Sequence, residues 1–204
     1  EAEAMEDEKK KVIYYKYMDS SQVKMAGYID KSGRYVKGIE DYIPISQYHT
    51  EEHREMVVQD IIDNWCQLSH NGKFQAKVET TSITEAIEYY RKKKKKNTGL
   101  KVTALFDHNI DNNGGSIFKE DGLVEIIKDY GETYGQEYSI ASFPKMKKDI
   151  AARLAHKAPY LTIERTKEKQ IDLLIVVDQM LTGFDSKWIN TLYMDKVMEY
   201  ENII

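Results

Sequence analysis

The chain of 204 residues contains one cysteine, three prolines and no long apolar run. A single cysteine, Cys66, excludes an internal disulfide and a thiolate metal cluster, and it fits a reducing compartment. No apolar stretch approaches the roughly 20 residues of a membrane-spanning helix. Residues 1–8 are acidic, whereas a secretory signal peptide begins with a positive region. These absences lead us to expect a cytoplasmic protein with no membrane partner.

Motifs for autonomous catalysis are also missing. No G-x-x-x-x-G-K-[ST] phosphate loop is present, because Gly72-Lys73 is followed by Phe74 and lacks the upstream glycine. No carboxylate cluster of a nuclease is visible either. His49-Thr-Glu-Glu52-His53 matches the H-x-x-E-H pattern of some zinc peptidases, but the sequence offers no convincing third ligand. We therefore expect no catalytic residue and no metal site in this chain, and keep a zinc hydrolase only as an alternative.

The charge balance limits what the chain binds alone. Its formal net charge is −4, whereas free-standing nucleic-acid binders usually carry a basic excess. The one basic block, residues 91–96, ends a predicted helix, where cations suit the helix dipole. A solvated helix end explains this block better than a DNA track does. Any DNA contact is expected to depend on a partner domain.

Strand and helix patterns alternate over most of the chain, which predicts right-handed crossovers and a parallel sheet. The amino-terminal part predicts a strand, a hairpin and a helix, at residues 12–18, 27–36 and 49–68. Further strands are predicted at residues 76–79, 100–106, 171–177 and 191–194, with a weaker one at 138–141. Further helices are predicted at residues 83–95 and 122–134, and after a capping Ser142 with Pro144 in the first turn.

Two loops carry candidate binding residues. Thr80-Thr81-Ser82 lies between a predicted strand and helix, where Ser82 and Glu85 form a capping-box pattern and free amides form an anion site. The hydroxyls could bind a phosphate, or Ser82 could simply cap the helix, and both can hold together. The second loop follows the apolar strand 173–177 and contains Thr182-Gly183-Phe-Asp185. Ligands bind outside the carboxyl ends of parallel strands, although this loop could also be an ordinary turn.

Four blocks give this sequence a family resemblance. Residues 173–186, with 190–196 after them, closely resemble motif V of superfamily 2 helicase-like motors, and the best match is the motor (R) subunit of type I restriction enzymes. Residues 72–90 look like motif IV of that family. The resemblance recurs at residues 102–112 and 148–157, in one order along the chain.

The resemblance implies a three-layer RecA-like (P-loop NTPase-like) α/β domain, the second of two motor domains, at residues 49–204. Motif IV would cover about residues 73–90 and motif V about 173–186, and the chain would stop before motif VI. Residues 1–48 would be a lead-in or an insertion. The family's DNA-backbone contacts fall on Thr80, Thr81, Ser82, Thr182 and Gly183, and its ATP-cleft positions on Gly183 and Asp185.

For the whole protein, the resemblance implies an ATP-dependent site-specific deoxyribonuclease that translocates double-stranded DNA. It would use ATP and Mg²⁺, work with a first RecA-like domain of the same chain, and assemble with methyltransferase and specificity subunits. This fragment alone should be inactive and hold no cofactor. The alternative is a non-catalytic DNA-binding or docking module of another superfamily 2 translocase.

Overall fold

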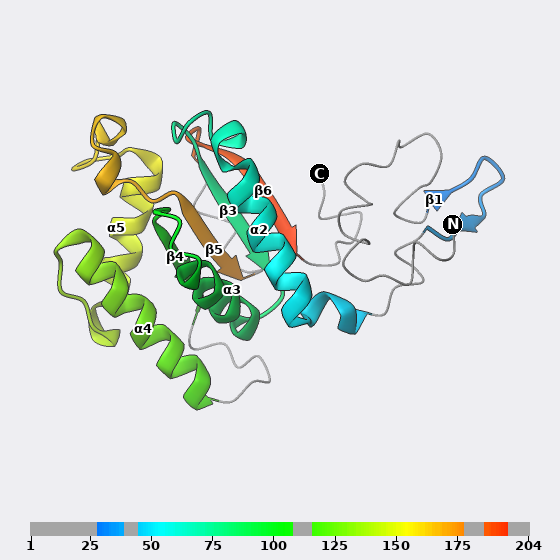
Figure 1. The fold of residues 1–204 in the computed structure, drawn as a ribbon, viewed down its shortest axis with the longest axis horizontal. Coiled ribbons are helices and arrows are strands. Elements are labelled where there is room, and N and C mark those ends of the chain that lie inside the picture. The colour runs from blue at the N-terminus through cyan, green and yellow to red at the C-terminus, as the bar shows by residue number, and fades with distance from the viewer. Residues whose placement is uncertain (1–27, 39–44, 108–115, 178–185, 196–204) are drawn as a thin grey trace. The chain divides into compact units, whose positions relative to one another are not determined.

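The computed structural model describes residues 28–38, 45–107, 116–177 and 186–195 (Figure 1). The chain divides into two compact units, Glu1–Asp60 and Ile61–Ile204, and the division falls inside helix α2 (Glu51–Leu68). The boundary expected between residues 48 and 49 stays a prediction. Among the described residues, no helix combines the length and apolar character needed to span a bilayer.

The first unit contains the predicted hairpin. Strands β1 (Tyr28–Ile29) and β2 (Tyr35–Val36) pair antiparallel. Asp30 Oδ1 accepts hydrogen bonds from the Ser32 and Arg34 amides at 2.8 and 3.0 Å, and Gly33 takes a left-handed φ of 79°. A short 3₁₀ helix, η3 (Ile45–His49), precedes α2. The strand predicted at residues 12–18 lies outside the described residues.

A four-stranded sheet organises the second unit. Its strands are β3 (Gln75–Thr80), β4 (Val102–Leu105), β5 (Leu173–Val177) and β6 (Ile189–Asp195), in the order β4-β5-β3-β6. All three pairings are parallel. The predicted parallel sheet and its four strong strands are confirmed. All of β5 is buried, as expected for a continuous apolar strand covered on both faces.

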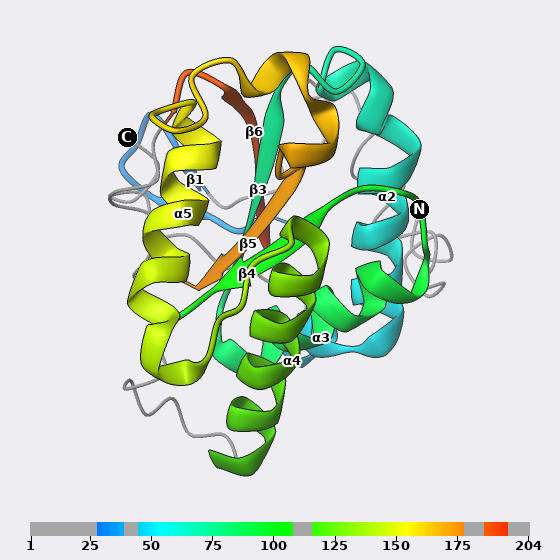
Figure 2. The same cartoon turned by 90° about the vertical axis from the view of Figure 1, so that its left-hand side faces the viewer.

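Helices α3 (Ile83–Lys95), α4 (Ser116–Tyr134) and α5 (Phe143–Ala155) cover this sheet (Figure 2). On one face, Tyr89 of α3 donates a hydrogen bond to Asp195 of β6. On the other face, His156 at the end of α5 lies against Gln75 of β3. Helices therefore flank both faces of a parallel sheet, which is the expected three-layer, RecA-like α/β architecture.

One face of α5 is apolar and buried, with four side chains at most 2% exposed: Phe143, Met146, Ile150 and Leu154. Ser142 lies at the N-cap position, but its side chain makes no cap hydrogen bond. Its Oγ accepts from the Ser139 amide at 2.8 Å instead. Pro144 occupies the first turn as predicted. Three short 3₁₀ turns complete the connections: η4 (Ile140–Ser142), η5 (Ile163–Arg165) and η6 (Lys167–Lys169).

Two predictions about the middle of the chain are wrong. Residues 138–141 form no strand, because the chain after α4 folds back along that helix, with the Gln136 amide bonded to the Gly131 carbonyl at 2.9 Å. Helix α4 also begins at Ser116, earlier than the predicted Gly122. Gly122 lies inside the helix, where the absence of a side chain lets α4 approach Ile87 of α3.

Candidate nucleic-acid interface at the carboxyl edge of the sheet

The carboxyl ends of β3, β5 and β6 meet at one edge of the sheet. Thr80, the last residue of β3, pairs in register with Val177 of β5 and with Asp195 of β6. The predicted motif IV loop therefore starts beside the strand end from which the predicted motif V loop leaves. This edge is where parallel sheets bind ligands.

Thr80 is fully buried, and its hydroxyl is bonded within the sheet. Its Oγ1 donates to the Val176 carbonyl at 3.1 Å and lies 3.3 Å from the Ser82 carbonyl. Phosphate oxygens only accept hydrogen bonds, so a donor already used internally is poorly placed for them. Thr81 and Ser82, which are half-buried, are the better placed hydroxyls of this loop.

Ser82 is the N-cap of α3. Its backbone is extended, and its Oγ accepts a hydrogen bond from the Glu85 amide at 3.1 Å. The predicted cap is confirmed. The first amides of a helix have no partner within it, and Ser82 satisfies one of them. The amides of Ile83 and Thr84 thus remain without an intrahelical partner at this end, in the arrangement that suits an anion.

Thr182, Gly183 and Asp185, the predicted contacts of the second loop, lie outside the described residues. The structure does describe the segment that follows them. Ser186 Oγ donates to the Leu154 carbonyl at the end of α5, at 2.7 Å, and also accepts from the Trp188 amide at 3.1 Å. Chain that leaves this loop is therefore attached to α5.

His156, at the end of α5, also contacts the segment that follows this loop. It ends α5 in a left-handed conformation with φ of 51°, and its ring stacks on Trp188 with centroids 4.0 Å apart and planes at 7°. Its Nδ1 lies 3.2 Å from Glu164 Oε2. Burial lowers the pKa of His156, an effect that the Glu164 carboxylate opposes.

The 148–157 block, one of the four blocks of the family resemblance, is structural in its described contacts. Arg153 is 3% exposed and donates to Asp149 Oδ2 and to the Lys169 carbonyl, both at 2.8 Å. Its guanidinium lies over the rings of Tyr134 and Tyr160, at 3.9 and 4.2 Å from their centroids. These contacts tie α4, α5 and η6 together beside the sheet.

The sequence patterns indicated no role for one hydrogen-bonded pair at this edge of the sheet. Tyr89 on α3 donates to Asp195 Oδ2 at 2.6 Å, which ties the predicted motif IV helix to the end of β6. A partial signal was available, because Asp195 ends a strand within a block of the family resemblance. Its partner lies 106 residues earlier in the chain, so spacing alone could not connect the two.

The basic block has internal partners. Arg91 pairs with Glu125 of α4 at 2.8 Å, and Lys94 pairs with Asp129. Lys93 is 2% exposed, donates to Thr98, and has a pKa lowered by burial. The block therefore joins α3 to α4. These contacts favour the interpretation that it is a helix end and not a DNA-binding track.

No group of three potential metal ligands occurs among the residues that the structure describes. His53 instead packs edge-on against Tyr48, and its backbone amide donates to Thr50. These contacts give the zinc-hydrolase alternative no support.

A parallel sheet between helices, with a capped helix end at its carboxyl edge, defines the class of this protein as a RecA-like α/β domain. Residues 72–204 match the family model described as type I restriction enzyme subunit R domain 3. This match covers more than half of the chain, so the chain belongs to that family.

Curated relatives agree with this assignment. A type I restriction enzyme endonuclease subunit of Staphylococcus aureus strain MRSA252 is 30% identical over 158 residues, which cover 74% of this chain and 16% of that protein. A second such subunit, from Staphylococcus saprophyticus, is 30% identical over 164 residues, covering 76% and 17%. The chain thus spans about a sixth of the length of these relatives.

Proposed function

We propose that this chain is part of the ATP-dependent, DNA-translocating and DNA-cleaving subunit of a type I restriction enzyme. Within that subunit it supplies half of the ATP cleft and contacts with the DNA backbone. The family and the printed names of the relatives support the restriction subunit. The sheet edge supports the local role.

The register at that edge carries the proposal. Thr80 opposes Val177, so the loop containing Thr81 and Ser82 starts beside the strand end that leads to Thr182 and Gly183. Hydroxyls and helix amides donate to phosphate oxygens without reading bases, which suits movement along any sequence.

The chemistry requires the rest of the subunit. A first RecA-like domain would contribute the phosphate loop and the Mg²⁺-binding acid, and ATP would bind between the two domains. Asp185 and Gly183 would face the nucleotide. Opening and closing of the cleft would move the two DNA-contacting loops along the backbone. The isolated chain is therefore expected to hydrolyse neither ATP nor DNA.

The assembly follows from the same proposal. Methyltransferase and specificity subunits would read the recognition sequence, and the enzyme would act in the cytoplasm on double-stranded DNA. The alternative, a silent module of another superfamily 2 translocase, is less well supported, because the matched family is a restriction subunit.

The test is DNA-stimulated ATP hydrolysis by the full-length parent. Thr182→Ala should raise the DNA concentration for half-maximal stimulation roughly tenfold, equivalent to about 1.4 kcal/mol. Asp185→Ala should lower turnover even with saturating DNA. The exposed Thr162 gives a matched control, and Thr162→Ala should behave as wild type.

Two results would count against the proposal in different ways. A parent without DNA-dependent hydrolysis is not a translocase, and the proposal fails. An active parent in which Thr182→Ala and Asp185→Ala match wild type retains the family role but loses the assigned site.

A further inference from the structure

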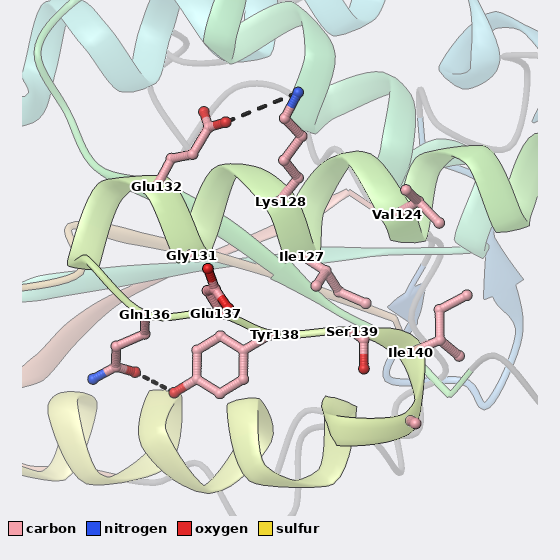
Figure 3. Close-up of a pocket in the computed structure, with 11 residues that line it drawn as sticks. Val124, Ile127, Lys128, Gly131, Glu132, Gln136, Glu137, Tyr138, Ser139 and Ile140 are labelled. Atoms are coloured by element: carbon pink, nitrogen blue, oxygen red, sulfur yellow. Dashed lines mark hydrogen bonds and ion pairs between the residues drawn. The ribbon is translucent and has the colours of Figure 1, made fainter.

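A groove lies between α4 and the segment 136–141 that follows it (Figure 3). Its volume is about 680 Å³. Ile127 of α4 and Ile140 of the facing segment extend into the space between the two (Figure 3), and Val124 of α4 also lines the groove. No residue of the candidate nucleic-acid interface lines it.

The floor of the groove is fixed by a close backbone contact. A Cβ atom at Gly131 would lie 2.4 Å from the Gln136 carbonyl oxygen, so the returning chain rests directly on the bare helix. Tyr138 packs near Tyr130, with ring centroids 5.9 Å apart. The groove is therefore a preformed feature of the second unit.

Two of the large apolar side chains that line the groove are accessible to solvent, whereas Ile127 is only 3% exposed. Val124 is 47% exposed and Ile140 is 37% exposed. Ile117, seven residues before Val124, is 75% exposed. Seven residues are two helical turns, about 10 Å, so Ile117 extends the apolar stripe of Val124 along the same helix face. An elongated stripe with anchors two turns apart fits a helix better than a compact small molecule.

The charges around this stripe are mostly negative. Glu132 and Glu137 line the groove, and Glu120 and Asp121 are exposed on the preceding turns of α4. Lys128, the cation among the lining residues, is paired with Glu132 at 3.9 Å. An occupant with apolar anchors and flanking lysines or arginines would complement this surface.

We propose that this groove docks an amphipathic helix with a basic rim, supplied by the part of the restriction subunit outside these 204 residues. The basic rim is inferred from the negative charges around the groove, which favour positively charged flanking residues on the partner. The relatives' length indicates where this helix comes from. The matched segment is only 16–17% of the curated relatives, so most of a subunit of that length lies outside it. Only this source rests on the proposed function, because the shape and charge of the groove do not depend on ATP or DNA.

The first test measures peptide binding by fluorescence anisotropy with the 204-residue protein. Two helical peptides of about 14 residues share a leucine stripe, and carry either lysines or glutamates along its rim. The lysine-rimmed peptide should bind at least tenfold more tightly. Val124→Asp and Ile140→Asp should each weaken it at least tenfold, while Leu161→Asp, at another exposed apolar side chain, should not. Circular dichroism confirms that each variant folds.

Charge reversal sharpens this test. Glu132→Lys combined with Glu137→Lys should transfer the preference to the glutamate-rimmed peptide. Equal binding of both peptides, no binding of either, or binding unchanged by Val124→Asp overturns the proposal. Sedimentation that shows self-association of the free protein, abolished by Val124→Asp, assigns the groove to a second copy and also overturns it.

The second test locates the occupant in the full-length parent. A photo-crosslinking residue at position 124 should react with a basic amphipathic helix elsewhere in the same chain. Crosslinks confined to another subunit would refute the proposed source. A parent without ATPase activity that still gives the intramolecular crosslink would refute the motor role and leave the docking site standing.

Discussion

Arg153 carries its charge where water is almost excluded. Asp149 accepts from its Nε, and the same carboxylate accepts from the Tyr130 and Tyr160 hydroxyls. Burial and the nearby carboxylate raise the pKa of Tyr160 to about 12, so this phenol keeps its proton as a hydrogen-bond donor well above neutral pH. Removing one partner of such a pair leaves a buried charge uncompensated.

We expect Arg153→Ala to lower the free energy of unfolding by about 3 kcal/mol. Arg153→Lys should cost less, because it keeps the charge but loses the planar group that stacks on Tyr134 and bonds to Lys169. Urea denaturation measures both values. Arg165→Ala, at an exposed arginine, is the control and should stay within about 0.5 kcal/mol of wild type. Equal stability of Arg153→Ala and the control would contradict the structural role of the block.

The contact between α3 and α4 depends on one missing side chain. A Cβ at Gly122 would lie 2.5 Å from Ile87 Cδ1, and Ile87 is fully buried. Alanine at position 122 would gain about 1 kcal/mol of helix propensity, but overpacking typically costs 1–3 kcal/mol. We expect Gly122→Ala to destabilise the protein by about 1 kcal/mol. Thermal denaturation measures the change.

A second substitution separates overpacking from other causes. Ile87→Ala removes all of the Ile87 side-chain atoms that lie 2.5–2.9 Å from the new Cβ, so the double variant should be more stable than the sum of the two single changes predicts. Simple additivity would show that Gly122 is not there to allow the close approach.

These elements show what the sequence could and could not supply. Local patterns predicted α3, the Ser82 cap, the hairpin at residues 27–36 and the four sheet strands, because caps, turns and apolar runs are encoded by neighbouring residues. The start of α4 was missed because Gly122 reads as a boundary locally, and its reason is a contact with Ile87, 35 positions earlier.

The candidate site also has a part that the sequence could predict and a part that it could not. Placing two loops at one sheet edge followed from the predicted parallel sheet, whose strands all end at the same edge, and is supported by the register of Thr80 and Val177. The internal use of the Thr80 hydroxyl could not be predicted, since its acceptor on β5 is 96 residues away. The roles of Thr81, Ser82, Thr182, Gly183 and Asp185 stay predictions.

The net charge of the chain predicts weak binding to DNA by the isolated chain. The formal net charge is −4, and Arg91 and Lys94 are already paired with acids of α4. The isolated chain is therefore expected to attract the phosphate backbone only weakly. Non-specific binders that succeed at physiological salt reach a Kd of roughly 10⁻⁴ to 10⁻⁶ M. We expect the isolated chain to bind duplex DNA more weakly than about 10⁻⁴ M at about 0.15 M salt, and the parent to fall within that range. Anisotropy with a labelled duplex measures both, and equally tight binding by the isolated chain would contradict the need for a partner domain.

The salt dependence of DNA binding by the parent tests the proposed uncharged contacts at the sheet edge. A lost lysine contact reduces the slope of log K against log salt by about one, because fewer counterions are released. Thr81 is uncharged, so Thr81→Ala should weaken parent binding several-fold at every salt concentration and leave the slope unchanged. Thr162→Ala should change neither quantity. A changed slope in Thr81→Ala would mean that the substitution has displaced a cationic contact elsewhere, and unchanged affinity would remove Thr81 from the interface.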